Sequence, residues 1–314
     1  MGRYLFRRAW QSALTLVVVV ILVFLGVRAL PGDPALALAG EDRSPAALAA
    51  IRHEYGLDKP LPVQFWRYVE QLLHGNLGHS INTGASVTSM LGTALPVTLE
   101  LTALAIVIAS IIGIGAGVLA AVRRGKPIEW FANGFALIGL SVPHFWLGLL
   151  AILYLSVGAG IFPASGFVSI WSDPVENLHH IILPAVILGT GLSAVLMRQT
   201  RSAMVDALNA DYIRTAKAKG NSPFTVYAKH ALANALMPVI TIVGLQTGAV
   251  LTGTVITETI FDWPGLGSLL YNAIQQRDYP LVQGCILLVA LIYVLVNLLT
   301  DLASAAANPR IRLS

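Results

Sequence analysis

Long apolar stretches, each of a length that crosses a lipid bilayer, are the feature that most constrains the folding of this chain. Hydrophobic residues make up 56% of the 314 residues, and charged residues make up only 11%. The hydrocarbon core of a bilayer is about 30 Å thick, and a helix needs about 20 apolar residues to cross it. The single cysteine, Cys285, excludes an intramolecular disulfide framework, so the fold must rest on helix packing. The sequence therefore predicts an all-α integral membrane protein.

Six stretches reach the length of a membrane span. They cover residues 9–30, 97–122, 131–157, 180–202, 232–257 and 280–303. An even number of crossings places both termini on one side of the membrane. With the N-terminus in the cytoplasm, most of the 20 lysine and arginine residues fall in the inner segments, as the positive-inside rule requires. We therefore expect six transmembrane helices and two cytoplasmic termini.

The segments between the spans are unequal and divide the chain into four parts. These are an N-terminal tail with the first span (1–30), an external segment (31–95), a core membrane domain (96–303) and a cytoplasmic tail (304–314). In the external segment, one helix is predicted from Ser44 to Tyr55, with Ser44 as its cap and Pro45 at its first position. A second helix, from Val63 to Leu73, has one apolar face. The two helices either contact an external partner or fill the gap between spans.

The sequence has no motif for catalysis or nucleotide binding. A P-loop needs Gly-x-x-x-x-Gly-Lys-Ser/Thr, but the Gly-Lys pair at Gly125-Lys126 runs into Pro127. His179-His180 would point about 100° apart on a helix, so they cannot chelate one metal ion together. His74 and His79 have no carboxylate or cysteine close in sequence. We expect a chain without catalytic residues, cofactor or metal ion.

Two pairs of glycines inside the spans predict close helix packing. Gly113 and Gly117 lie in the second predicted span, and Gly244 and Gly248 lie in the fifth. Glycines four residues apart share one face of a helix and let another helix approach closely. We interpret both pairs as packing surfaces.

Ionisable side chains near the spans matter because a charge in hydrocarbon costs at least about 2.5–3.5 kcal/mol. Four of them lie toward the ends of spans: Glu100, Arg198, Glu258 and Asp301. None lies clearly at mid-membrane, which disfavours a carrier driven by an ion gradient, because such carriers place charged groups or broken helices there. Glu258 is the strongest candidate for a pathway or gate residue, together with Phe261 and Trp263 in the turn-rich segment that follows it.

A dense basic segment, Asp211 to Gly220, lies between the fourth and fifth spans. Good helix formers predict a helix over Tyr212–Lys219, which Asp211 would cap or complement and Gly220 would end. A second short helix is predicted from Ser222-Pro223 to His230. This shape suits insertion into a groove of a partner protein, and the alternative is a basic segment that binds anionic lipid.

The basic segment resembles the cytoplasmic "EAA" loop of bacterial ABC importer permeases in the dipeptide/oligopeptide/nickel subfamily. Further motifs match in the same order, namely Leu30–Pro34, Tyr55–Pro60, Pro96–Leu101, His230–Asn234, Glu258–Gly267, Arg277–Pro280 and Asn308–Arg312. Asn76 and Asn308 replace commonly acidic residues, and Ala216-Lys217 stand where the name of the loop leads one to expect an alanine pair. We infer no loss of transport from these departures.

The resemblance implies a type I ABC importer permease fold in the bacterial cytoplasmic (inner) membrane. Such a chain is a non-catalytic subunit that forms half of a pathway for di- or oligopeptides and works by alternating access. Its partners are a homologous second permease, two cytoplasmic ABC ATPases that bind ATP and Mg, an external solute-binding protein and membrane lipid, and no nucleic acid. Nickel chelates, glutathione or another small solute are alternative cargoes. An ion-coupled secondary carrier is the alternative class of protein, and a membrane scaffold is another.

The resemblance also implies an ATPase-coupling loop at about residues 205–235. Its expected functional residues are Asp211, Tyr212, Arg214, Ala216, Lys217, Lys219, Gly220 and His230. In this interpretation Ala216 contacts the ATPase and Gly220 makes the turn. Arg214, Lys217 and Lys219 then supply charges at the rim of the contact.

Overall fold

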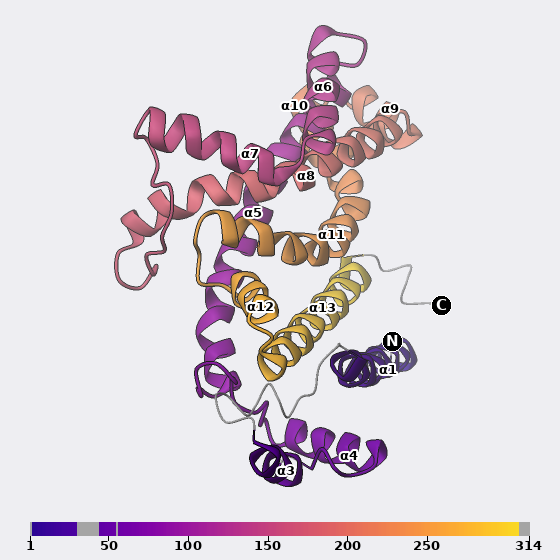
Figure 1. The fold of residues 1–314 in the computed structure, drawn as a ribbon. Coiled ribbons are helices and arrows are strands. Elements are labelled where there is room, and N and C mark those ends of the chain that lie inside the picture. Colours follow the sequence, from indigo (N-terminus) through magenta and orange to yellow (C-terminus); the bar gives the residue numbers. More distant parts are fainter. Residues whose placement is uncertain (1, 30–43, 55, 308–314) are drawn as a thin grey trace.

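The computed structural model describes residues 2–29, 44–54 and 56–307. Within these ranges the chain is helical and has no β-strand beyond one isolated bridge between His79 and Ser86. The predicted all-α fold is confirmed (Figure 1). The motif at Leu30–Pro34 lies outside the described residues. Tyr55 and residues 308–314 of the predicted tail also lie outside them.

Five helices are long and apolar enough to cross a membrane, and a bent pair of helices makes a sixth candidate if the pair is counted as one span. The five are α1 (Gly2–Ala29), α5 (Val87–Val122), α8 (Pro174–Leu208), α11 (Ala233–Ile260) and α13 (Tyr279–Ala307). The bent pair consists of α6 (Pro127–Ser141), followed by α7 (His144–Ala151) with the π-helix η1 (Ile152–Gly158). The shorter helices are α3 (Pro45–Glu54), α4 (Leu61–Leu73), α9 (Asp211–Ala218), α10 (Pro223–Thr225), π-helix η2 (Val226–Leu232) and α12 (Leu266–Gln275).

The third span differs from the continuous run predicted over 131–157. Its two halves meet at an angle of 99°. Pro143 accounts for the break, because it has no N–H to continue the helix and it disfavours a helical conformation at Val142, whose ψ is 126°. The apolar composition continues through the break, so hydrophobicity alone could not reveal the bend.

Two other spans begin earlier than predicted. α5 starts at Val87, inside the segment predicted as external, because Leu91 and Ala94 are buried against α12 and α13. α8 starts at Pro174, where the Asp173 side chain accepts hydrogen bonds from the N–H groups of Val175 and Glu176 at 3.0 and 3.1 Å. These bonds satisfy backbone N–H groups in the first turn, which have no hydrogen-bond acceptor within the helix.

The helices between α1 and α5 lie near the end of the first span. The predicted cap of α3 is confirmed, since Ala47 N–H donates to the Ser44 hydroxyl at 3.3 Å. α4 is fixed to α1 by Arg28, whose guanidinium donates to Gln64 Oε1 at 2.9 and 3.2 Å. The ring of Phe24 packs edge-on against Phe65, with centroids 5.2 Å apart. These contacts hold α4 across the end of the first span.

The core lies where α5 crosses α8. A Cβ at Gly113 would lie 2.6 Å from the Ser193 carbonyl oxygen, and one at Gly117 would lie 2.7 Å from that of Met197. Only glycine lets the two backbones come this close. The second glycine pair packs against side chains of α13, where a Cβ at Gly244 would collide with Thr300 and one at Gly248 with Tyr293.

Helix α1 packs on the outer face of α13, away from the α5–α8 core (Figure 1). Near the start of α1, Arg8 forms an ion pair with Asp301 near the end of α13, with 2.7 Å between Nη2 and Oδ1. The start of the first span and the end of the last span therefore lie at the same end of the bundle. This geometry agrees with the predicted even number of crossings.

We predict that Gly117→Ala destabilises the fold while Gly115→Ala does not. The new methyl group at 117 would lie 2.6 Å from Thr200 Cβ, whereas nothing lies within 4 Å of a Cβ at 115. Overpacking of this kind costs about 1–3 kcal/mol. Thermal unfolding of the purified protein in detergent should show a lower midpoint only for the change at 117. Equal midpoints for the two variants would contradict the packing described here.

Candidate functional site

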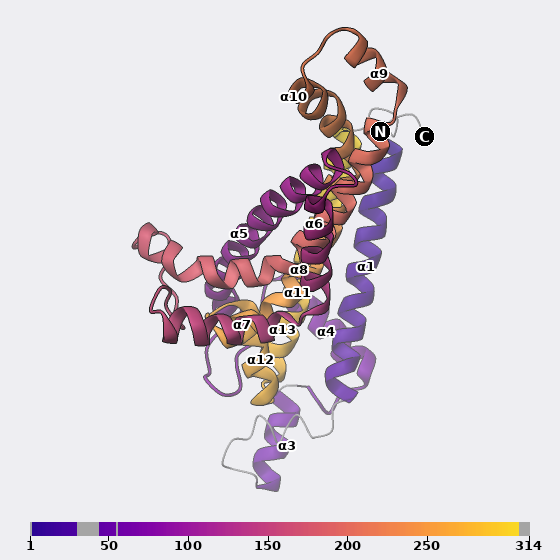
Figure 2. The same ribbon diagram turned by 90° about the horizontal axis from the view of Figure 1, so that it is seen from above.

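The basic loop projects from one end of the bundle. Figure 2 shows α9 and α10 beyond one end of α1, with α3 and α4 at the other. We call these the loop end and the distal end. The first predicted helix of the loop is confirmed within a residue at each end, because α9 covers Asp211–Ala218. Gly220 then adopts the left-handed conformation with φ +76°, which ends the helix without steric cost.

The second helix of the loop does not end at His230 as predicted. It begins at Pro223, where the Ser222 hydroxyl accepts from Thr225 N–H at 3.3 Å, and then continues through η2 into α11. Residues Pro223–Ile260 therefore form one continuous helical segment. A displacement of the loop would be transmitted directly to the fifth span.

Asp211 does not cap α9. Ala210 is the N-cap residue, and Asp211 lies in the first turn, where its charge complements the helix dipole. Its carboxylate also lies 3.4 Å from Arg214 Nη1, with both side chains largely exposed. An exposed pair of this kind contributes little to stability. Of the two functions predicted for Asp211, the structure supports complementing the helix end.

One face of α9 is buried against its own chain. Ile213 and Ala216 belong to an apolar cluster with residues of α5, α8, η2 and α11, which we call the loop cluster: Ala121, Met204, Ala207, Ile213, Ala216, Val226, Ala231 and Ala235. Ala216 is only 6% exposed. The small side chain of Ala216 lets α9 pack on the bundle, and the predicted contact of Ala216 with an ATPase stays a prediction.

The opposite face of the loop is free to meet a partner. Arg214, Lys217 and Lys219 are exposed along α9. Two aromatic rings accompany them, since Tyr212 is 42% exposed and Phe224 is 80% exposed. His230, in contrast, is only partly exposed within η2. Exposed rings next to cations form a surface typical of protein contacts rather than of a merely solvated loop.

An ion pair that the sequence analysis missed fastens α6 to α8 at the loop end. The Arg201 guanidinium donates to Glu129 Oε1, with Nε at 2.9 Å, and the N–H of Gly125 donates to Glu129 Oε2 at 2.6 Å. Arg201 is therefore engaged within the chain rather than part of the free basic surface. Glu129 lies in the first turn of α6, two residues before the span predicted over 131–157, so no signal in the sequence indicated this pair.

Glu258 is a buried anchor at the distal end. Its side chain is fully buried and accepts hydrogen bonds from Thr98 Oγ1 at 2.6 Å, Gly267 N at 2.7 Å and Ser268 N at 3.0 Å. Thr98 Oγ1 in turn accepts from Leu266 N at 2.7 Å. Gly265, the N-cap of α12, has no side chain to satisfy these amides. The carboxyl group therefore joins α11, α5 and the start of α12.

Phe261 and Trp263 are buried beside this anchor, with 2% and 1% exposure. The Phe261 carbonyl accepts from Gly166 N at 3.1 Å, and the Trp263 ring packs on Phe167 with centroids 5.0 Å apart. Neither side chain, nor that of Glu258, faces an open passage in this conformation. Their function as pathway or gate residues stays a prediction.

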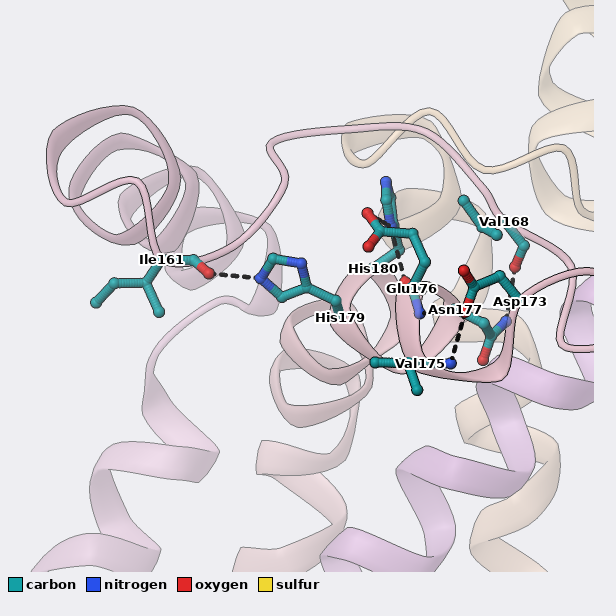
Figure 3. A network of polar contacts seen from close by, with 8 residues as sticks. All are labelled: Ile161, Val168, Asp173, Val175, Glu176, Asn177, His179 and His180. Carbon is teal, nitrogen blue, oxygen red and sulfur yellow. Dashed lines mark hydrogen bonds and ion pairs between the residues drawn. The ribbon is translucent and has the colours of Figure 1, made fainter.

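A polar network ties the segment 159–173 to the start of α8 (Figure 3). Asn177 is buried and donates to the Val168 carbonyl at 2.7 Å and to Glu100 Oε1 of α5 at 2.6 Å. The His179 ring nitrogen Nε2 lies 2.7 Å from the Ile161 carbonyl, while His180 bonds back to the Glu176 carbonyl at 2.9 Å. The two histidines point apart, as predicted from their spacing, and bind separate backbone groups.

No group of three His, Cys, Asp or Glu side chains that could hold a metal ion occurs among the residues that the structure describes. The polar groups gathered at the two ends of the bundle bind other parts of the same chain. The polar side chains described above connect helices of this chain, and the exposed face of the basic loop offers a surface for contact with another protein.

Comparison with known proteins gives two family matches. Residues 113–313 match the family described as "Binding-protein-dependent transport system inner membrane component". Residues 1–102 match the family described as "Binding-prot-dependent transport system membrane comp, N-term". Together the two matches extend over both the first span and the core.

Several relatives are similar over nearly the full chain. The dipeptide transport system permease protein DppB of Escherichia coli (strain K12) is 43% identical, with 99% of each chain covered. The di/tripeptide transport system permease protein DppB of Pseudomonas aeruginosa (strain UCBPP-PA14) is 44% identical, with 94% of each covered. The glutathione transport system permease protein GsiC of Salmonella typhimurium is 40% identical, with 99% of each covered.

A solved structure of the MetNI methionine ABC transporter in an inward facing conformation shares the fold. The TM-score is 0.55 and the identity is 19%, and the match covers 70% of this chain and 96% of that chain. At this identity the likeness concerns the fold alone.

We predict that Glu258→Ala destabilises the protein strongly. The change removes the acceptor for Gly267 N, Ser268 N and Thr98 Oγ1, and each buried group left unsatisfied costs about 1–3 kcal/mol. Glu176→Ala is the matched control, because that side chain is 50% exposed and surface changes usually alter stability by less than about 0.5 kcal/mol. Thermal unfolding should separate the two variants, and similar midpoints would show that Glu258 is not an anchor.

Proposed function

The chain belongs to the family of binding-protein-dependent transport system inner membrane components, and from that premise we propose that it is the permease subunit of an ATP-driven importer of di- and oligopeptides. The likeness to dipeptide and di/tripeptide permeases over almost the whole chain is the observation that carries the proposal. Glutathione is the second candidate cargo, because a relative of similar identity bears that name. Nickel chelates or another small solute remain alternatives.

The energy for import comes from partner chains in this proposal. The sequence has no P-loop, and the basic loop offers a surface with which an ATPase can engage. The proposed assembly contains this chain, a homologous second permease, two ABC ATPases that bind ATP and Mg, and an external solute-binding protein. Each permease forms half of the pathway, and this chain is the non-catalytic part.

We place the loop end in the cytoplasm and the distal end outside. Arg8, Arg201 and the exposed lysines of α9 all lie at or near the loop end. Lysine and arginine accumulate in the cytoplasmic segments of membrane proteins. The first and last spans then have their termini inside, in a bacterial inner membrane, and α3 and α4 lie on the external side.

The proposed coupling follows the packing of the loop. An ATPase would contact the exposed face of α9 through Tyr212 and Lys217, and α10 through Phe224. Because Ile213 and Ala216 are buried in the loop cluster, movement of α9 would pull α8 and α11 with it. We propose that α5 and α8 turn as one unit relative to α13, which contributes no residue to the loop cluster. The turn opens the pathway alternately to each side.

The two carboxyl groups predicted near the spans give no support to an ion-coupled carrier. Such a carrier needs charged groups that exchange ions with a water-filled pathway. Glu258 is fully buried with three donors on its carboxyl group, and Glu100 accepts from Asn177. Neither carboxyl group is available to carry ions in this conformation.

Reconstitution tests the function directly. The chain would be copurified with its second permease and ATPases, placed in proteoliposomes and supplied with the binding protein and radiolabelled alanyl-alanine. We expect uptake that requires ATP and persists when ionophores abolish ion gradients. Uptake that needs a proton or sodium gradient and ignores ATP would establish the carrier alternative instead.

We predict that Gly220→Asp uncouples ATP hydrolysis from uptake while Gly75→Asp does not. Both glycines have positive φ, +76° and +71°, and nothing lies within 4 Å of a Cβ at either position. The backbone strain of the two substitutions should therefore be similar, about 1 kcal/mol. Only Gly220 adjoins the proposed ATPase contact. ATPase stimulation and alanyl-alanine uptake measured in the same vesicles provide the readout, and full coupling in Gly220→Asp would refute the proposed function of the loop.

A further inference from the structure

The two halves of the bent pair are long and apolar enough to cross a membrane only together. α6 has 15 residues, and α7 and η1 have 8 and 7 residues. A helix of 15 residues is about 22 Å long, which is less than the hydrocarbon thickness of about 30 Å. Neither half can cross the bilayer alone. The turn at Val142-Pro143 therefore cannot lie in water beyond the membrane surface.

The break removes one backbone hydrogen bond and is followed by an ionisable side chain. Pro143 has no N–H to donate to the Gly139 carbonyl, so the normal helical hydrogen bond at this position is absent. The next residue, His144, is the first of α7, and its side chain is exposed on the surface of the chain. An ionisable ring and a freed carbonyl thus occur within a few residues of each other in a membrane span.

The orientation of the His144 ring is fixed by α8. Its Nδ1 lies 3.2 Å from Thr190 Oγ1. The Thr190 hydroxyl donates its proton to the Ile187 carbonyl at 2.8 Å, so it accepts from Nδ1–H. This bond fixes the edge of the ring that carries Nδ1 against α8.

α8 also provides the space that the ring needs. A Cβ at Gly191 would lie 2.6 Å from Cε1 and 2.9 Å from Nε2 of His144. A larger residue at position 191 would displace the ring from this place. The hydrogen bond to Thr190 and the contact with Gly191 hold the imidazole at the junction of α6, α7 and α8.

A polar ring held in this place is costly if it faces lipid. Ionisable groups in spans are expensive in hydrocarbon and usually face a bundle interior or a water-filled cavity. Broken helices at mid-membrane likewise mark the sites where transporters contact their cargo. We propose that His144 lines the solute pathway and that the solute passes the exposed side of its ring. The proposal rests on the importer function given above.

The single cysteine makes the proposal testable by thiol labelling. Cys285 is fully buried, so Cys285→Ala supplies a cysteine-free parent chain. His144→Cys is then compared with Leu149→Cys, five residues along and about 140° round an ideal helix. Leu149 is 52% exposed and apolar, which suits a lipid-facing position. Both variants are assembled with the partner subunits in proteoliposomes and treated with a water-soluble methanethiosulfonate reagent.

We expect His144→Cys to react at least about tenfold faster than Leu149→Cys, because the reactive thiolate forms in water and not in hydrocarbon. Addition of alanyl-alanine with the binding protein and ATP should slow labelling at 144 and leave labelling at 149 unchanged. Equal rates at the two positions, or a rate at 144 that ignores the dipeptide, would overturn the proposal.

The same vesicles separate this inference from the importer function. ATP-dependent alanyl-alanine uptake by the Cys285→Ala parent reports on the importer alone. If the parent transports but position 144 behaves like position 149, only the pathway assignment fails. If the parent does not transport alanyl-alanine, the proposed peptide import fails by itself, and the ratio of the two labelling rates still decides whether position 144 faces water.

Discussion

The close approach of α5 and α8 at Gly113 and Gly117 is the interaction on which the rest of the structure depends. Lipid tails are as apolar as the side chains of the spans, so burial from lipid supplies little force between helices, and small residues and polar bonds must hold them together. Polar bonds hold α8 to its neighbours near both ends. Arg201 of α8 binds Glu129 of α6 at the loop end, and Asn177 of α8 binds Glu100 of α5 at the distal end.

This arrangement explains how a chain without a nucleotide site of its own could respond to ATP binding by a partner chain. α8 ends at the loop, and the loop cluster joins α9 to the cytoplasmic ends of α5, α8 and α11 in the proposed orientation. Around this unit lie segments with irregular helix geometry, the π-helix η2 before α11 and the 99° break in the third span. Irregular segments of this kind often mark functional sites in helices. The core pair is rigid by packing, and its surroundings contain the places that can bend.

The sequence predicted the parts of the fold that depend on composition and local chemistry. Six crossings follow from apolar length, and α9 with its left-handed Gly220 follows from helix propensity and glycine's conformational freedom. The bend at Pro143 was missed because both halves of the span are apolar. The burial of Ala216 and the bonds of Glu258 were missed because they depend on which helices meet, and one chain's pattern does not specify that.

The central claim is that α5 and α8 move as one unit against α13 when the ATPases close. Pulsed electron paramagnetic resonance on a cysteine-free parent can test it with two pairs of spin labels, one at Leu119 and Arg198 across α5 and α8, the other at Lys217 and Leu299 between the loop and α13. All four side chains are exposed. The account predicts that ATP binding to the assembled complex changes the distance from Lys217 to Leu299 and leaves that from Leu119 to Arg198 unchanged. A change between Leu119 and Arg198, or none between Lys217 and Leu299, would contradict it.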